Sequence, residues 1–265
     1  MNKINKEYQL QKQLYVEALV EKDYMEIYEA NLLKNDFILK LGEPKYELHK
    51  LEITIARTKL KLEMMQTCIK FNRPIDVEYI DRSLEKEFEK HYNMLKSMKN
   101  ELEFVRSLGI SGDLPVKEAD EIKKLYYSIA SFIHPEIADE NDKKAKRMWN
   151  AAKKAYQQGD LTKLGKLQKK VMAEYNNMAE IAVQPENTLK EEVDSLREKT
   201  GAVISEIEKL KKRFPFNEAE MLGDDNAVLK SKKDMDFDIT IAKEVLDKLE
   251  KQILEKLPPT GKFLN

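Results

Sequence analysis

A histidine and a carboxylate flank a proline at His134-Pro135-Glu136, and this is the point of the chain best suited to specific polar contacts. The proline ring fixes one backbone angle, so the neighbouring side chains are held in a restricted geometry. The imidazole can donate and accept hydrogen bonds near neutral pH, and the carboxylate accepts them. The tripeptide therefore predicts a fixed recognition tip for another protein, at which no bond is broken. The alternative is that the His-Pro pair simply ends a helix.

The other residues with chemical potential are scattered. His49 and His91 lie far from His134 in the sequence, and neither has a second histidine or cysteine at the spacing of a metal site. Cys68 is the single cysteine, so it cannot form an internal disulfide. The sequence also contains no glycine-rich phosphate loop and no Gly-x-Ser-x-Gly motif. We therefore expect a protein that is not an enzyme and carries no metal and no cofactor.

Two short helices are expected to hold the His134 loop. One covers residues 123–133, and the other begins at about Asp142. Gly159 and Asp160 then predict the end of the second helix and the N-cap of a third. Apolar residues at helical spacing predict a shared core, formed by Tyr126, Ile129, Ala130 and Ile133 on the first helix and by Trp149, Ala152, Ala155 and Tyr156 on the second.

This pair of helices resembles the J domain, the co-chaperone module that acts on DnaK-type heat-shock chaperones. In that family an antiparallel helix pair carries His-Pro-Asp in the connecting loop, and the resemblance here extends from Lys123 to Tyr156. Glu136 replaces the aspartate of the signature, and Tyr127 and Ser128 stand where the family usually has basic residues. The resemblance implies that a chaperone would be bound by His134, Pro135, Glu136, Lys123, Lys124 and Tyr127.

Charge is distributed unevenly along the chain. The whole protein has a net charge of −1, but between residues 121 and 170 twelve Lys or Arg stand against six Asp or Glu, which gives this segment a charge of about +6. Such a field can steer an acidic partner toward the segment. The lysines could also contact nucleic acid phosphates, yet nucleic acid binding is not expected, because Tyr126 and Trp149 are needed in the core and cannot stack on bases.

Long helices flank the central segment. Charged residues make up 36% of the 265 residues and there are only 8 Gly and 8 Pro, a composition typical of long helices and coiled coils. An apolar stripe through Leu10 and Leu14 predicts a helix over residues 5–41 that ends at Gly42-Glu43-Pro44. Apolar residues at alternating three- and four-residue spacing predict further helices over residues 45–71, 76–109, 189–214 and 235–253. A tight turn is expected at Asn72-Arg73-Pro74, and Asp76 is the predicted N-cap of the helix that follows it.

These patterns predict an all-α fold in which long helical or coiled-coil hairpins flank a small, central J-domain-like helical unit. We expect residues 1–110 to form a long-helix hairpin or three-helix layer and residues 116–180 to form the J-domain-like unit. Residues 185–257 are expected to form an antiparallel coiled-coil hairpin, and residues 258–265 a tail.

The leading hypothesis is a J-domain-like co-chaperone or adaptor that binds a DnaK-type heat-shock chaperone through its basic helices and the His-Pro-Glu loop. The alternative is a non-catalytic coiled-coil scaffold or oligomerisation protein, whose arms form a homo-oligomer and whose J-like unit no longer stimulates a chaperone. The single cysteine and the lack of a charged-then-apolar leader favour the cytoplasm. No apolar run approaches the roughly 20 residues that span a bilayer, so membrane association is not expected.

Overall fold

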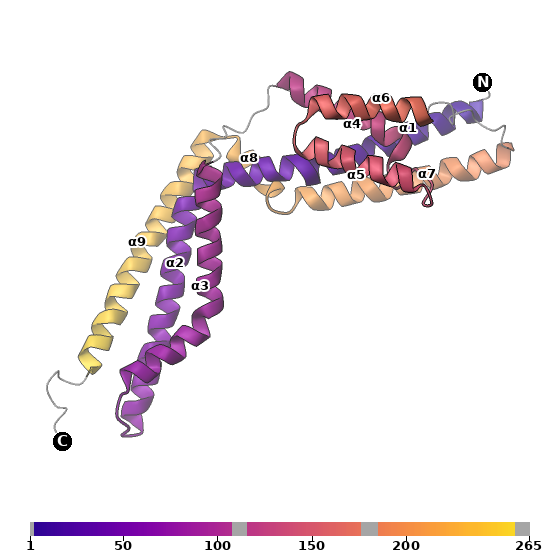
Figure 1. The fold of residues 1–265 in the computed structure, drawn as a ribbon. Helices are drawn as coiled ribbons and strands as arrows, with labels where there is room; N and C mark the ends of the chain where they lie inside the picture. Colours follow the sequence, from indigo (N-terminus) through magenta and orange to yellow (C-terminus); the bar gives the residue numbers. More distant parts are fainter. Residues whose placement is uncertain (1–2, 108–115, 176–184, 258–265) are drawn as a thin grey trace. The chain divides into compact units, whose positions relative to one another are not determined.

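The computed structural model describes residues 3–107, 116–175 and 185–257, and within these ranges the chain forms helices and turns but no strand (Figure 1). The predicted all-α fold class is therefore confirmed. Over the same ranges, no helix has both the length and the apolar character that crossing a bilayer demands.

The chain divides into two compact units, each assembled from segments that are distant in the sequence. Unit 1 comprises residues 1–34 and 111–219, and unit 2 comprises residues 35–110 and 220–265. This division differs from the boundaries expected from the sequence, because each of the two flanking segments contributes helices to both units. The reason lies in the apolar faces of the long helices.

Unit 1 is built around three short helices, α4 (Val116–Ile133), α5 (Lys143–Gln157) and α6 (Leu161–Tyr175). Two long helices, α1 (Lys3–Tyr24) and α7 (Glu186–Lys211), complete the unit (Figure 1). A π-helical segment, Met25–Glu29, continues α1, and a 3-10 turn, Phe216–Glu218, follows α7.

Helix α1 has two buried faces. Val16 and Val20 belong to one apolar core with α4, α5 and α6, while Tyr15 and Leu19 pack with α7 residues that include Val203. A helix with apolar side chains on two faces must be covered on both, which explains why α1 joins the central helices and α7 instead of an N-terminal layer. The stripe predicted through Leu10 and Leu14 is wrong at those two positions, because their side chains are 48% and 39% exposed.

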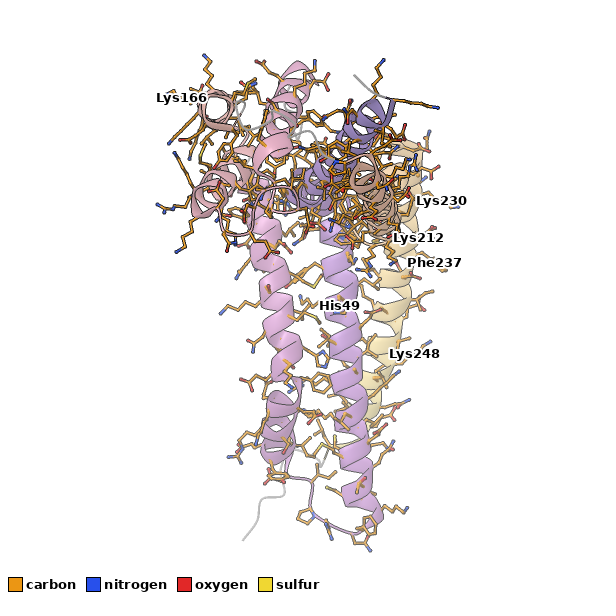
Figure 2. All side chains as sticks on the ribbon, turned by 90° about the vertical axis from the view of Figure 1, so that its right-hand side faces the viewer. His49, Lys166, Lys212, Lys230, Phe237 and Lys248 are labelled. Carbon is orange, nitrogen blue, oxygen red and sulfur yellow. The ribbon has the colours of Figure 1, made fainter. Side chains whose placement is uncertain are left out.

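Unit 2 contains α2 (Ala30–Lys70, from residue 35 onward), α3 (Val77–Ser107), α8 (Ala219–Leu222) and α9 (Asp225–Lys256). The three long helices α2, α3 and α9 lie side by side (Figures 1 and 2). Ile239 and Ala242 of α9 pack against Leu51 of α2. The hairpin expected for residues 185–257 is therefore replaced by two separate pairings, of α7 with α1 and of α9 with α2.

The turn between α2 and α3 follows the sequence-based expectation. Asn72 adopts a left-handed backbone with φ of 51°, a conformation that asparagine tolerates, and the amide of Arg73 donates to the carbonyl of Cys68 over 2.8 Å. Asp76 caps α3, because its carboxylate accepts a hydrogen bond from the Tyr79 amide at 2.9 Å. The predicted N-cap is thus confirmed.

The helix break expected at Gly42-Glu43-Pro44 is wrong, since α2 continues through Pro44 without interruption. Gly42 has a packing role instead. A Cβ atom added there would lie only 3.0 Å from the Leu102 Cδ1 atom of α3, so the glycine allows α3 to approach α2 closely. An ion pair between Arg106 and Glu43 joins the same two helices. Tertiary packing therefore outweighs the local signal of the glycine and proline.

Candidate functional site

The helices α4 and α5 hold the His134 loop through an aromatic core. Tyr126 of α4 is fully buried, stacks on Tyr156 at a ring distance of 4.0 Å, and meets Trp149 at 5.1 Å. Burial raises the pKa of Tyr126, and the neighbouring Asp23 carboxylate raises it further. The predicted core residues of both helices, Tyr126, Ile129, Ala130, Ile133, Trp149, Ala152, Ala155 and Tyr156, are all buried in one cluster.

The His134-Pro135-Glu136 loop is closed by its own backbone. The His134 carbonyl accepts hydrogen bonds from the amides of Ile137 and Ala138, both at 2.8 Å. The Glu136 amide donates to the Nδ1 atom of His134 over 3.1 Å, which leaves that nitrogen without a proton in this arrangement. Pro135 and Glu136 are exposed, whereas His134 is only 7% exposed. The loop is thus compact, with its histidine turned inward.

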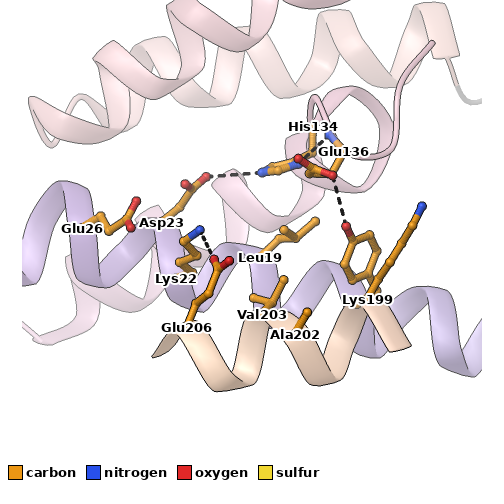
Figure 3. A pocket seen from close by; sticks show the side chains of 11 residues that line it. Leu19, Lys22, Asp23, Glu26, His134, Glu136, Lys199, Ala202, Val203 and Glu206 are labelled. Carbon is orange, nitrogen blue, oxygen red and sulfur yellow. Dashed lines mark hydrogen bonds and ion pairs between the residues drawn. The ribbon is translucent and has the colours of Figure 1, made fainter. Parts of the chain in front are cut away.

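Asp23 of α1 links the loop to the aromatic core. Its Oδ2 atom accepts a hydrogen bond of 2.8 Å from the Tyr126 hydroxyl. The same atom lies 3.7 Å from the Nε2 atom of His134 (Figure 3). The His134 ring also meets Trp149 edge-on at 4.7 Å. Because Nδ1 accepts from the loop backbone, Nε2 is the nitrogen that presents a proton toward the carboxylate. Asp23 therefore places a carboxylate beside the inner nitrogen of the imidazole.

Glu136 is also engaged by α1. The Tyr15 hydroxyl donates a hydrogen bond of 3.4 Å to its Oε2 atom (Figure 3). Burial raises the pKa of Tyr15, and the Glu136 carboxylate raises it further, so the phenol remains a donor. Both polar side chains of the tripeptide thus contact residues of α1.

A groove lies beside the loop. It has a volume of about 330 Å³ and is lined by α1, by the loop, and by α7 residues that include Val203 and Glu206 (Figure 3). Lys22 of α1 and Glu206 of α7 form an ion pair of 2.5 Å at its edge. The groove contains both acidic and basic side chains, and it is partly open to solvent.

The other predicted contact residues, Lys123, Lys124 and Tyr127, lie elsewhere on α4. Lys123 precedes His134 by eleven residues, about 16 Å along a helix. Its ammonium group forms an ion pair of 2.5 Å with Glu21 and lies 4.7 Å from the centre of the Tyr24 ring. Lys124 is exposed and Tyr127 is half-buried. The six predicted residues therefore form two sets, one at the loop and one on the face of α4 beside α1.

A basic surface covers α5 and α6. Ten Lys and Arg side chains on these two helices are exposed, and Lys166 projects outward from α6 (Figure 2). Lys144 pairs with Glu174, while the other nine have no ion pair among the described residues. These nine are Lys143, Lys146, Arg147, Lys153, Lys154, Lys163, Lys166, Lys169 and Lys170.

Asp142 anchors the start of α5. Its carboxylate accepts hydrogen bonds from the amides of Lys144 and Ala145, so Asp142 is the N-cap of α5, and a further one of 2.7 Å from the Tyr175 hydroxyl of α6. The Tyr175 hydrogen bond, followed by the Ala145 amide, holds the pKa of Asp142 below its usual value. Asp160 similarly caps α6, because it accepts from the Lys163 amide at 2.9 Å.

Sequence reasoning missed Asp23 and Tyr15, which contact the two polar residues of the loop. A signal for Asp23 was present, since it continues the spacing of Val16 and Val20 and precedes Ile27, so that a charged residue occupies a position on an apolar face. Nothing in the local sequence of Tyr15 identifies Glu136 as its partner. Over the described residues, no group of three or more His, Cys, Asp or Glu side chains could hold a metal ion.

Comparison of the chain with protein-family models, with curated proteins and with solved structures finds no match.

Proposed function

We propose that the chain is a J-domain-like co-chaperone or adaptor, and that its α4–α6 helices dock on a DnaK-type heat-shock chaperone. The observation that carries the proposal is the placement of the tripeptide at the junction of α4 and α5. Pro135 and Glu136 are exposed there, and the paired cores of the two helices hold the loop in one conformation. The residues of this helix pair also carry the resemblance to the J domain.

The charge of the surface next to the loop supports a protein partner with an acidic face. Nine exposed lysines and arginines on α5 and α6 have no ion pair among the described residues, so they are available to an incoming partner. Complementary charge mainly accelerates association and orients the partners. Stacking on nucleic acid bases is not supported, because Tyr126 and Trp149 are 0% and 6% exposed.

We also propose that the protein is not an enzyme and that it works in the cytoplasm. Its interactions are polar contacts and surface charge, for which no cofactor is needed. The single cysteine, half-buried on α2, is compatible with a reducing compartment.

The proposal is tested by measuring ATP hydrolysis by a DnaK-type chaperone with the wild-type protein and with His134→Gln. We expect stimulation by the wild type and its loss in the variant. His91→Gln is the matched control, because His91 is exposed on α3 in unit 2, and it should stimulate like the wild type. Absence of stimulation, or equal stimulation by all three proteins, would exclude the co-chaperone function.

Glu136→Asp adds a third arm to this assay. The change keeps the carboxylate and restores the residue that the J-domain signature has at this position. Stimulation only by Glu136→Asp would indicate an inherited module that has lost its activity. Equal stimulation by this variant and by the wild type would show that glutamate serves as well as aspartate.

A specific observation favours a second candidate, a scaffold or oligomerisation protein. His134 is only 7% exposed, and the side chains of both His134 and Glu136 face partners on α1, so the loop already has contacts within its own chain. On this hypothesis the loop is structural and the long helices mediate self-association. A monomer in light scattering at high concentration, together with His134-dependent ATPase stimulation, would contradict it.

A further inference from the structure

We propose that α7 is a built-in cover for the His134 loop, and that release of α7 from α1 controls access to the loop groove. The inference rests on the proposed function in one respect, since it takes the loop to be the part that a partner recognises. The claim that α7 shields His134 can be tested by measurements of this protein alone, without a chaperone.

The groove beside the loop is built in part from α7. Its floor is formed by α1 and the loop, and one of its walls is formed by four residues of α7, which are Lys199, Ala202, Val203 and Glu206 (Figure 3). His134 and Glu136 both line this groove. Removal of α7 would therefore remove a wall from the space into which both polar loop residues face.

Helix α7 can separate from α1 without exposing the apolar core that α1 shares with α4, α5 and α6. The cluster that unites α4, α5 and α6 takes Val16 and Val20 from α1 and Ile27 from the π-helical segment, and no described residue of α7 belongs to it. Helix α7 instead packs on a different face of α1, where Val203 and Ile207 are its buried members. The covering helix and the structural core thus use different faces of α1.

The loop itself contacts the apolar cluster that α1 and α7 share. Ile137, the residue after Glu136, is partly buried and packs against both the α4–α6 core and the cluster of α1 with α7. Departure of α7 would remove part of this packing. Closure of the groove and order in the loop are therefore coupled through one side chain.

The polar contacts between α1 and α7 are ion pairs near the surface. Two ion pairs join α1 to α7, Lys22 with Glu206 at 2.5 Å and Arg197 with Glu7 at 2.8 Å. The hydrogen bond with Lys22 lowers the pKa of Glu206, and the same bond raises the pKa of Lys22. Surface pairs of this kind contribute modestly, so the closed state can be shifted by a change of charge.

The experiment is a charge swap across the seam, using Lys22→Glu, Glu206→Lys and the double variant. The readout is the rate at which diethyl pyrocarbonate acylates His134, followed by mass spectrometry on the intact, folded protein. His49 and His91, on α2 and α3 of unit 2, are internal references in each sample, because the chain has three histidines. Far-ultraviolet circular dichroism confirms that the helices remain folded.

Each single variant should acylate His134 at least about threefold faster than the wild type, because like charges then face each other across the seam. The double variant should return to the wild-type rate, and the two reference histidines should not change. A direct electrostatic effect on the imidazole would have opposite signs in the two single variants, whereas opening accelerates both. Unchanged rates, or opposite changes, would overturn the inference.

The chaperone assay then separates this inference from the proposed function. If α7 covers a chaperone-binding loop, each single variant should stimulate ATP hydrolysis more strongly than the wild type, and addition of His134→Gln should abolish the gain. Faster acylation of His134 without any ATPase effect would support α7 as a cover and exclude the co-chaperone function. Unchanged acylation of His134, together with ATPase stimulation equal to that of the wild type, would support the co-chaperone function and exclude α7 as a cover.

Discussion

Each unit contains a buried polar residue, and the two residues are satisfied in different ways. Thr58 in unit 2 is 8% exposed, and its hydroxyl donates over 2.8 Å to the carbonyl of Thr54, one turn earlier in the same helix. His134 in unit 1 is 7% exposed, and its ring is held by the Glu136 amide, by Asp23 of α1 and by Trp149 of α5. One residue is satisfied locally and the other by several elements.

The difference indicates in which unit a buried polar residue depends on contacts between different elements. A polar group that is satisfied within its own helix places no demand on neighbouring helices, so the burial of Thr58 does not depend on how the helices of unit 2 pack. A polar network across three elements is lost when any element moves, because each buried group left without its partner is costly. Unit 1 is therefore the region in which single substitutions should have the largest and most specific effects.

The largest effect is expected from Trp149→Ala. The indole is 6% exposed and contacts both Tyr126 and His134, so its loss creates a cavity between the core and the loop. We expect the free energy of unfolding of unit 1 to fall by about 3–5 kcal/mol, as measured by denaturant titration with circular dichroism.

Phe237→Ala in α9 is the matched control for this loss of an aromatic ring. Its side chain is 67% exposed and lies in unit 2 (Figure 2). The change should stay within about 0.5 kcal/mol. Similar losses in both variants would contradict the distinction between the two units.

An intermediate effect is expected from removing one hydroxyl of the stacked tyrosine pair. Tyr126→Phe deletes the donor to Asp23 and leaves a half-buried carboxylate without that bond, so we expect a loss of about 1.5–3 kcal/mol. The Tyr156 hydroxyl is buried and has no hydrogen-bond partner among the described residues, so Tyr156→Phe should be neutral or slightly stabilising. Trp149, the single tryptophan, gives a fluorescence signal that reports on unit 1 in both variants.

Thr58→Val extends this comparison to unit 2. The substitution removes a hydroxyl whose hydrogen bond lies within one helix, and it keeps the shape of the side chain. We expect a change below about 1 kcal/mol by circular dichroism. A loss equal to that of Tyr126→Phe would show that local and network satisfaction contribute alike, and would remove the contrast between the units.

The sequence predicted the parts of this molecule that depend on local spacing. The all-α class, the caps at Asp76 and Asp160, and the paired cores of α4 and α5 all follow from residues within a few turns of each other. In each case the partner atom or side chain lies close in sequence or repeats with the helical period.

Long-range pairing was not predictable in the same way. The sequence shows that α1, α7 and α9 each have apolar residues to bury, but a heptad stripe does not identify the helix that covers it. Asp23 and Tyr15 meet His134 and Glu136 across more than one hundred residues. The role of Gly42 was not predicted, because it depends on Leu102 of another helix and not on the residues next to Gly42 in the sequence.

The smallest effect is expected at the junction of α5 and α6, where the polar contact lies near the surface. Because hydrogen bonds hold the pKa of Asp142 below its usual 3.8, its contribution to stability is complete above that pH and is lost as the pH falls through the lower value of the folded state. Burial, followed by the Asp142 bond, raises the pKa of Tyr175 from 10.0 to about 12, so the tyrosine's contribution is present below pH 10 and lost between pH 10 and 12.

Asp142→Asn should therefore lower the midpoint of denaturant unfolding at pH 7, followed by Trp149 fluorescence, while asparagine still caps the helix. The difference from the wild type should shrink as the pH falls below about 3.8, because the wild-type carboxylate is then protonated as well. Tyr175→Phe should reproduce part of the loss at pH 7, since it removes one of the three donors to the carboxylate. A difference between Asp142→Asn and the wild type that is the same at every pH would mean that the charge of Asp142 has no part in joining α6 to the start of α5.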